Sequence, residues 1–387
     1  MKKGAGMRVI VVGAGLAGLT LAQGLRGAGI DVAVYERDDP LVRTQGVSLH
    51  VDDRGTEALR ACLPSAHAAM VEATMGGPRE QTLTLSEVDG ALTVAGAQPS
   101  DGVAGRARPG RQVHRPLLRA VLLTGLEDVV RFGAEFTRFE QRADGTVRAW
   151  FADGGTDTAD VLVGADGIGS AVRRQYLPHA RVVNTGRRML MGATALRAVA
   201  DTGLLELIGH SPASVRVNGT MMVLGALRFT ESPVAARQRW LPALPLNAVA
   251  QVEDYVMWAL PITREQLGSA GSPAAVWRRA KELTADLPPA LRSVVAEAWP
   301  DSTRALRGGT IPPIPGWPAG PVTVIGDAIH LAPGFGGNLA MRDAHHLCES
   351  LVQTYHGRLD LIDAIGVYEN TMRRNTFSAP VATKAGA

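Results

Sequence analysis

The residues with the clearest chemical meaning lie near the N-terminus, where Gly13, Gly15 and Gly18 have the spacing G-x-G-x-x-G. In that spacing the first glycine allows a tight turn, the second lets the backbone approach a pyrophosphate, and the third lets a helix pack close to a sheet. Glu36 follows Gly18 near the distance expected of an acid that binds a ribose hydroxyl. The pattern predicts a dinucleotide site. Its candidate contacts are Gly13, Gly15, Leu16, Ala17, Gly18, Glu36 and Arg37.

The segments around this motif are those of a strand–helix–strand unit. Residues 8–12 form a β-branched run that is typical of a buried parallel strand, helical spacing continues to Gly27, and residues 31–35 predict a second strand. A signal peptide is the alternative for the first residues, but the motif glycines interrupt its apolar stretch. An ordinary glycine-rich turn would explain neither the second strand nor Glu36. We therefore expect an α/β protein with a Rossmann-like nucleotide-binding domain.

Composition excludes several classes of function. The chain has 387 residues, of which 46% are hydrophobic and 20% charged, so it can build a core. A net charge of +3, without runs of like charge, argues against a nucleic-acid partner. No uninterrupted apolar stretch of about 18 residues predicts a membrane span. Cys62 and Cys348 have no metal-ligand spacing and cannot form a disulfide framework, so we expect no metal site and a cytoplasmic protein.

Two later segments place an Asp-Gly or Gly-Asp pair after a predicted strand. The run 161–164 leads to Asp166 and Gly167, with Ser170 as a candidate helix N-cap. The run 322–325 leads to Gly326 and Asp327, followed by a loop rich in proline and glycine. A plain turn is the alternative for the first segment, and a surface loop for the second.

Together with Glu36 and Arg37, these segments resemble in order and spacing the fingerprints of the class A flavoprotein monooxygenases, the aromatic-hydroxylase family typified by para-hydroxybenzoate hydroxylase. The resemblance covers nearly the whole chain and is greatest to compact members, the tetracycline-inactivating and salicylate-hydroxylase-like enzymes. It implies FAD as cofactor, NAD(P)H as reductant with NADPH favoured, and O2 as co-substrate. The implied reaction is hydroxylation of a hydrophobic aromatic or polyketide-like molecule through a flavin C4a-hydroperoxide, by a monomer or homodimer.

The resemblance also implies site residues. Asp166 would contact FAD and the reduced nicotinamide, Asp327 would bind a ribitol hydroxyl, and the helix that begins near Asn338 would direct its positive end to the flavin. Arg43 and Arg115 match arginines that reach the cofactor, with solvated surface as the alternative for both, and Arg119 ranks below them. The remaining implied cofactor contacts lie in the loop after Asp327: Pro333, Gly336, Gly337 and Asn338.

No catalytic residue is assigned. His50, His210 and His330 are candidates for a base that ionises a phenol, and a structural role for His330 is an equal alternative. The loop after Asp327 is shorter than the relatives' pattern, which leaves two other functions open. One is a flavoprotein of this fold with Baeyer–Villiger or dehydrogenase chemistry, and the other is a non-redox cyclase or binding protein.

The chain order predicts an interrupted domain organisation. Residues 1–75 and 101–180 are expected to bind FAD, 76–100 to form a hairpin of the substrate domain around Asp89-Gly90, 181–270 to form a mixed β-sheet substrate domain, and 271–387 to complete the FAD-binding domain and end in helices. Strands are expected at 189–196, 214–217, 220–227 and 255–260, and one helix over 272–299, ended by Pro288-Pro289.

The middle of the chain is rich in large apolar residues that allow two interpretations. They either line an apolar substrate pocket or belong to the core of the sheet, and for any one of them the core is favoured. The residues concerned are Met221, Met222, Phe229, Met257 and Trp258.

Overall fold

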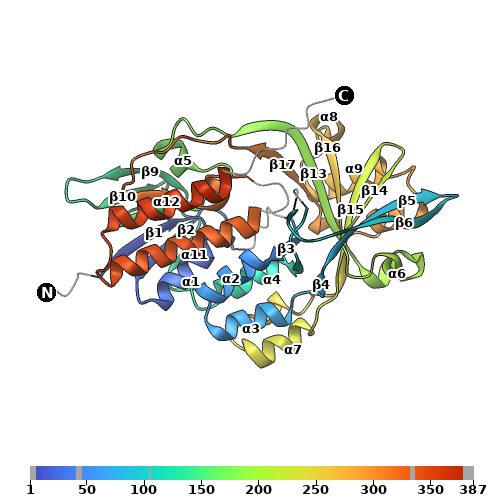
Figure 1. The fold of residues 1–387 in the computed structure, drawn as a ribbon, viewed down its shortest axis with the longest axis horizontal. Helices are drawn as coiled ribbons and strands as arrows, with labels where there is room; N and C mark the ends of the chain where they lie inside the picture. Colours follow the sequence, from blue (N-terminus) through green and yellow to red (C-terminus); the bar gives the residue numbers. More distant parts are fainter. Residues whose placement is uncertain (1–5, 41–45, 104–105, 332–335, 378–387) are drawn as a thin grey trace.

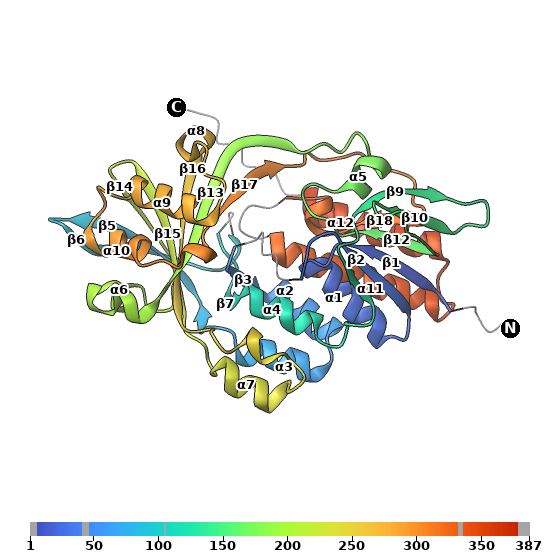
Figure 2. The same ribbon diagram turned by 180° about the vertical axis from the view of Figure 1, so that it is seen from behind.

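The computed structural model describes residues 6–40, 46–103, 106–331 and 336–377. In Figure 1 a five-stranded sheet with helices α1, α11 and α12 lies on the left, and the long strands β13 to β17 form a second sheet on the right. Figure 2 shows the small strands β3 and β7 between these two parts. A site formed between the two parts therefore draws residues from both sheets.

The five-stranded sheet is parallel and has the strand order β18-β12-β1-β2-β8. Its strands are β1 (Arg8–Val12), β2 (Asp31–Glu36), β8 (Val130–Phe132), β12 (Val161–Gly164) and β18 (Val322–Val324). Strand β12 is buried along its whole length, as expected of a parallel sheet that is covered on both faces. The predicted Rossmann-like α/β domain is confirmed.

The helices of this part of the fold are α1 (Leu16–Gly27), α2 (Asp53–Cys62), α3 (Ser65–Ala73), α4 (Arg115–Leu123), α5 (Ala171–Tyr176), α11 (Gly336–Tyr355) and α12 (Leu361–Phe377). Three of them, α1, α2 and α11, meet at Gly24. A Cβ atom on Gly24 would lie 2.7 Å from the sulfur of Cys348 and 3.3 Å from that of Cys62, so glycine allows the close approach. Both cysteines are buried and free. Within the described ranges, no helix has the length and apolar character to cross a membrane.

The second sheet has seven strands in the order β17-β13-β16-β15-β14-β5-β6. Its strands are β5 (Gln81–Val88), β6 (Ala91–Pro99), β13 (Val183–Ala195), β14 (Ala213–Val217), β15 (Thr220–Leu227), β16 (Tyr255–Thr263) and β17 (Arg304–Thr310). The predicted strands of the middle region are present, and Asp89 and Gly90 have positive φ values of 51° and 80° in the turn between β5 and β6. Strand β5 pairs with β14 in parallel, so the early hairpin joins the later strands as expected.

Two three-stranded sheets and several short helices complete the fold. The sheets are β11-β10-β9 and β3-β7-β4, with strands β3 (Ser48–Asp52), β4 (Pro78–Arg79), β7 (Gly110–His114), β9 (Phe136–Gln141), β10 (Val147–Phe151) and β11 (Thr156–Ala159). The short helices are α6 (Leu204–Ile208), α7 (Pro233–Trp240) and α8 (Arg264–Leu267).

The return to the nucleotide-binding domain comes later than residue 271. Strand β17 pairs with β13 in the seven-stranded sheet, and Val276 and Leu291 belong to the core of that sheet. The chain rejoins the parallel sheet only at β18. Two helices of this segment pack their apolar faces on the seven-stranded sheet, so the segment belongs with the substrate domain. The sequence pattern shows that these faces are apolar but does not show what they contact.

The segment 272–299 forms two helices where one was expected, α9 (Pro273–Leu283) and α10 (Pro289–Ala296). Pro288 is the N-cap of α10 and Pro289 its first residue. Proline is well tolerated there, because the N–H group that it lacks would have no acceptor within the helix. The proline pair therefore begins a helix, whereas we expected it to end one.

Glu369 of α12 is a buried acid, 2% exposed, which accepts a hydrogen bond from Thr323 Oγ1 at 2.9 Å. Burial raises its pKa to about 7 from 4.5, although the hydrogen bond lowers it. The folded state therefore binds more protons than the unfolded state between these pH values, so the free energy of unfolding falls as pH rises through this window. The full shift corresponds to roughly 3 kcal/mol.

We expect Glu369→Gln to flatten this dependence. Relative to the parent, the variant should gain roughly 2–3 kcal/mol in the free energy of unfolding between pH 5 and pH 8, measured by urea unfolding. Glu57→Gln, at an exposed position of α2, is the control and should follow the parent at every pH. Parallel curves for Glu369→Gln and the parent would contradict the assignment.

Candidate active site

The glycine motif forms the tight turn that its spacing predicted. Gly13 has a φ of +110° and donates its N–H to the carbonyl of Tyr35 at 2.7 Å. A Cβ atom on Gly18 would lie 2.0 Å from the carbonyl oxygen of Gly13, so the first turn of α1 packs directly on the loop. A Cβ atom on Gly15, by contrast, would meet nothing within 4 Å. The N-terminus of α1 therefore faces open space in which an anion can lie.

Glu36 ends β2 beside this turn. Its Oε2 accepts the N–H of Ala14 at 2.7 Å, and its Oε1 accepts the N–H of Asp38 at 3.0 Å. The neighbouring Arg37 is exposed and forms an ion pair with Asp38. The carboxylate thus lies at the glycine loop, where the sequence placed a ribose-binding acid.

One cleft of about 370 Å³ brings together the glycine motif, Glu36, the Arg115 segment and the Asp166-Gly167 turn. Seven predicted contacts line it: Gly13, Gly15, Leu16, Glu36, Arg37, Arg115 and Asp166. The predicted contacts Asp327, Gly336, Gly337 and Asn338 are not among its lining residues. Ala17 and Gly18 lie behind the lining, and Ala17 packs toward the position that a Cβ atom of Gly326 would occupy, at 3.2 Å. Arg119, which ranked lower, also lines the cleft and donates Nε to the carbonyl of Ala14 at 3.2 Å. Segments from three distant parts of the chain therefore share one cavity.

Asp166 lines the cleft, and one of its two carboxylate oxygens accepts the N–H groups at the start of α5. Its Oδ2 accepts the N–H groups of Ala171 at 2.7 Å and Val172 at 3.2 Å. Its Oδ1 is buried and accepts no hydrogen bond from any residue that the structure describes. Ser170 is the N-cap of α5 and accepts the N–H of Arg173 at 2.8 Å, as its position in the sequence suggested.

Arg173 is a site residue that the sequence analysis did not identify. It is 3% exposed, and its guanidinium donates to the carbonyl of Ala328 at 2.6 Å and to that of Ile168 at 2.9 Å. Ile168 belongs to the loop after Asp166, and Ala328 to the one after Asp327. Arg173 therefore joins the two loops. An arginine three residues after a helix N-cap was the only signal available, and such arginines are common on surfaces.

Asp327 and Arg115 face each other at the carboxyl end of β18. Burial lowers the pKa of Arg115 and raises that of Asp327, while the attraction between the two charges acts in the opposite direction on each. Gly336, the first residue of α11, approaches the carboxylate, since its Cβ atom would lie 3.0 Å from Oδ1 of Asp327. Asp327 therefore lies beside the N-terminus of a long helix, within the electrostatic range of the Arg115 cation.

His330 is enclosed within the protein and paired with Asp343. It is 1% exposed, its Nε2 lies 2.5 Å from Oδ2 of Asp343, and the same oxygen accepts the N–H of Gly326 at 2.9 Å. Burial alone would lower the pKa of His330, but the charge and hydrogen bond of Asp343 together raise it. Of its two interpretations, the geometry favours the structural one. His50 hydrogen-bonds through Nε2 to the carbonyl of Arg108, and His210 lies exposed beside Gly77.

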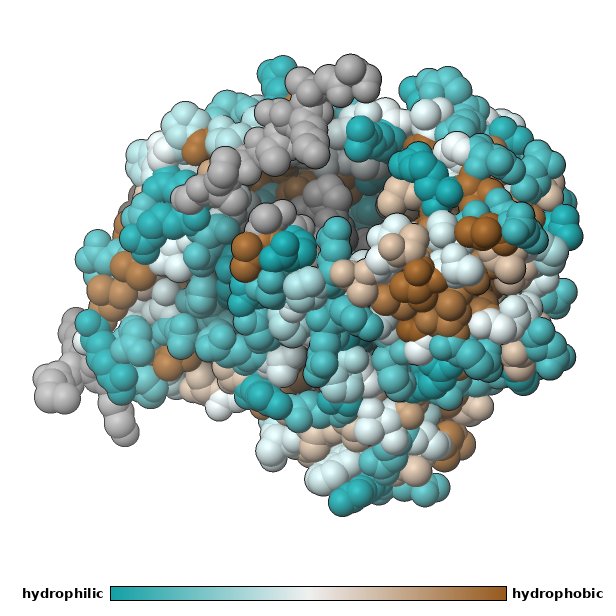
Figure 3. Space-filling view, turned by 45° about the vertical axis from the view of Figure 1, so that its right-hand side comes forward, coloured by the Kyte–Doolittle hydropathy of each residue, from teal (hydrophilic) through white to brown (hydrophobic). Residues whose placement is uncertain are grey.

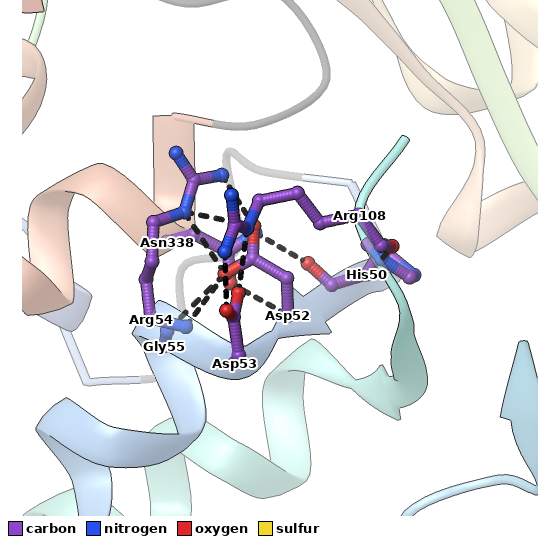
Figure 4. Close-up of polar contacts among 7 residues, drawn as sticks. All are labelled: His50, Asp52, Asp53, Arg54, Gly55, Arg108 and Asn338. Atoms are coloured by element: carbon purple, nitrogen blue, oxygen red, sulfur yellow. Dashed lines mark hydrogen bonds and ion pairs between the residues drawn. The ribbon is translucent and has the colours of Figure 1, made fainter. Parts of the chain in front are cut away.

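Asn338 lies in the first turn of α11 and links that helix to β3. Its Oδ1 accepts the N–H of Asp52 at 3.0 Å, and its Nδ2 donates to the carbonyl of His50 at 2.8 Å. Figure 4 shows this link beside Arg54 and Arg108, whose guanidinium groups pair with the carboxylates of Asp52 and Asp53. Gly337 packs on Leu49 of the same strand. The amide therefore holds the N-terminus of α11 in place.

Two predicted contacts, Arg43 and Pro333, lie outside the described residues. In the part of the chain with assigned positions, no group of three or more His, Cys, Asp or Glu residues could hold a metal ion. The orphan Oδ1 of Asp166, the open space at Gly15 and the acid at Glu36 fit a dinucleotide whose pyrophosphate lies at α1. The Asp327–Arg115 pair fits the far end of such a molecule.

Comparison with known proteins agrees with this geometry. A family model described as "FAD binding domain" matches residues 6–365. The chain is 31% identical to the dual O-methyltransferase/FAD-dependent monooxygenase CTB3 of Cercospora beticola over 97% of its own length, but it spans only 46% of that protein. It is thus about half as long as the first curated relatives that it matches.

A second relative is similar over most of both chains. The FAD-dependent urate hydroxylase of Klebsiella pneumoniae is 29% identical, and the match covers 94% of this chain and 85% of the relative. Among solved structures, a protein from Photorhabdus luminescens subsp. laumondii, described as an FAD-containing monooxygenase, superposes with a TM-score of 0.77 at 26% identity, covering 95% of this chain and 94% of the other.

Proposed function

Because the chain belongs to the FAD-binding-domain family of flavoprotein monooxygenases, we propose that it uses NAD(P)H and O2 to hydroxylate a small aromatic or polyketide-like molecule. The observation that carries this proposal is the single cleft in which Gly15, Glu36, Arg115 and Asp166 meet. These residues come from separate motifs and contribute their polar groups to one cavity.

When bound, FAD would supply the redox chemistry, since it accepts hydride from NAD(P)H and activates O2 for transfer of one oxygen atom to a substrate. The protein's own groups would bind and orient. The N–H groups at the start of α1 would hold the pyrophosphate, and Glu36 would accept a ribose hydroxyl. Oδ1 of Asp166 has no donor among the described residues, so it can accept a hydrogen bond from the cofactor.

Asp327, which lies within the electrostatic range of the cleft residue Arg115, would accept a hydrogen bond from a ribitol hydroxyl. Burial raises the pKa of Asp327, and the charge of Arg115 counteracts part of this rise in favour of the carboxylate, which is the stronger acceptor. The N-terminus of α11, which Asn338 fixes to β3, would stabilise negative charge on the flavin ring. The seven-stranded sheet would form the wall that excludes water from the reacting groups.

The proposal is tested first by the visible spectrum of the purified protein. We expect flavin absorption bands from bound FAD, consumption of NADPH under air that a substrate stimulates, and a product heavier than the substrate by one oxygen atom. The substrate panel should contain phenols, polyketide-like compounds and urate, because one relative is a urate hydroxylase. Protein that neither retains nor takes up FAD would overturn the proposal, as would turnover without incorporation of oxygen from O2.

A further inference from the structure

The seven-stranded sheet has one face in the core and one face turned to the small sheet β3-β7-β4. Met222 and Trp258 are fully buried in the core of the sheet, so they are core residues. Met221 and Met257 alternate with them and lie half-buried on the opposite face. Figure 3 shows a hydrophobic patch on the part of the molecule that carries this sheet. The second face is therefore the one that can meet an apolar ligand.

The small sheet places a cation and an amide opposite this face. Arg79 pairs with Gly110 and Gln112 with His50, so Arg79 and Gln112 lie on the same face of the small sheet. A Cβ atom on Gly225 would lie 2.8 Å from Nη2 of Arg79 and 3.1 Å from Oε1 of Gln112. Gly225 is the cross-strand neighbour of Met257. Both polar groups thus lie over the sheet, next to the methionine.

Arg79 carries a buried charge without a counter-ion. It is 4% exposed, and the hydrogen bond found for its guanidinium is from Nη2 to the carbonyl of Ala226 at 3.2 Å. No carboxylate of a described residue lies within ion-pair distance of it, and the segments outside the described ranges contain no Asp or Glu. Burial lowers the pKa of Arg79 to about 10, which still leaves it protonated at neutral pH.

Two other arginines of the site differ because a carboxylate charge acts on them. The charge of Asp327 acts on the half-buried Arg115, and that of Asp166 acts on the buried Arg173. Gln112 is a second buried residue with an unsatisfied polar atom, because its Oε1 accepts no hydrogen bond from any residue that the structure describes. Its Nε2 is already used by Ser48. A buried cation without a counter-ion and a buried acceptor without a donor are costly unless a ligand supplies these groups.

We propose that Arg79 and Gln112 bind an anionic oxygen of the substrate and a donor beside it, so that the substrate is a flat apolar molecule with an ionised acidic group. Met257 and Met221 would contact its apolar body, because methionine adapts to irregular shapes. A phenolate, an enolate or a carboxylate supplies the same charged oxygen. This inference rests on the proposed function, because it names the substrate class of the same site.

The test measures binding to the oxidised holoprotein by calorimetry, without NAD(P)H, so that it does not depend on turnover. The probes are two matched pairs. In the first, 2-hydroxy-1,4-naphthoquinone, which is ionised at neutral pH, is compared with its 2-methoxy ether; in the second, 2-naphthoate is compared with its methyl ester. We expect the parent to bind the anion of at least one pair about tenfold or more tightly than its neutral partner. The pair that shows the preference distinguishes an enolate from a carboxylate.

Arg79→Met should remove this preference while binding of the neutral probes and the FAD content stay unchanged, and Arg79→Lys should retain part of it. Arg307→Met, which removes an exposed arginine from β17 of the same sheet, is the control and should behave as the parent. Equal binding of anion and neutral partner by the parent would overturn the inference without any variant, as would a preference that survives in Arg79→Met. Loss of FAD or of oxygen transfer would instead refute the proposed function, so the two failures are distinguishable.

Discussion

Replacing Gly15 with valine should abolish retention of FAD while the apoprotein stays folded. A Cβ atom at this position meets nothing within 4 Å, so the larger side chain has room in the protein alone. It would occupy the space in which the pyrophosphate approaches the start of α1. We expect FAD affinity to fall roughly 100-fold or more, about 2.7 kcal/mol, as measured by fluorescence titration of the apoprotein. The loss of folding stability should be only about 1 kcal/mol, because Gly15 is the N-cap of α1.

Substitutions at two other glycines of α1 serve as controls for this result. Gly27→Val changes a position that is also open within 4 Å but lies at the other end of the helix, so it should bind FAD as the parent does. Gly18→Ala places a Cβ atom 2.0 Å from the backbone of Gly13 and should therefore destabilise the fold itself. If Gly15→Val retained FAD with the affinity of the parent, the pyrophosphate could not lie at this helix.

Arg173→Met should weaken both the fold and the cofactor site. The substitution removes the donors to the carbonyls of Ala328 and Ile168, and the buried carbonyl of Ala328 gains no replacement. Two lost hydrogen bonds from a charged group predict a decrease of about 3 kcal/mol in the free energy of unfolding. The loops that carry Asp166 and Asp327 would lose their link, so we expect FAD affinity to fall about tenfold as well.

Urea unfolding and FAD titration measure the two effects separately. Arg181→Met, at an exposed position after α5, removes the same charge without a loop contact and should leave both quantities near the parent values. Arg173→Lys should be intermediate, because one ammonium group cannot reproduce a guanidinium that reaches two carbonyls. Full stability and full FAD affinity in Arg173→Met would show that the two loops hold their positions independently.

Local patterns were sufficient for the first part of the fold. The β-branched run, the glycine spacing and the acid that follows lie within 36 residues, and each depends on neighbours in the chain. Strand β1, helix α1 and strand β2 form as expected, with Glu36 beside the turn. The strands of the middle region were predictable for the same reason, because β-branched and apolar runs between turn residues favour strands in any context.

Which element covers each face of a strand or helix is decided by contacts between distant segments of the chain. The alternation of Met221, Met222 and Gly225 could show that the first two lie on opposite faces, but not which face meets the core. The same holds for α9 and α10, whose apolar faces join the seven-stranded sheet, and for Asn338, whose amide binds β3 nearly 290 positions earlier in the chain.

The sequence likewise shows which side chains are charged, whereas the tertiary structure decides which of them are buried and paired. The sequence shows that Arg79, Arg115 and Arg173 are cations, and a cation is ordinarily solvated. The tertiary structure buries Arg79 and Arg173 and partly buries Arg115. It places Arg115 within the electrostatic range of Asp327 and gives Arg173 two carbonyls, but supplies Arg79 with one carbonyl contact. Periodicity along a chain is a local property, whereas desolvation and pairing depend on what other segments bring to the same place. For that reason the cofactor motif was readable from residues 8–36, and the unpaired charge opposite the methionine face was not.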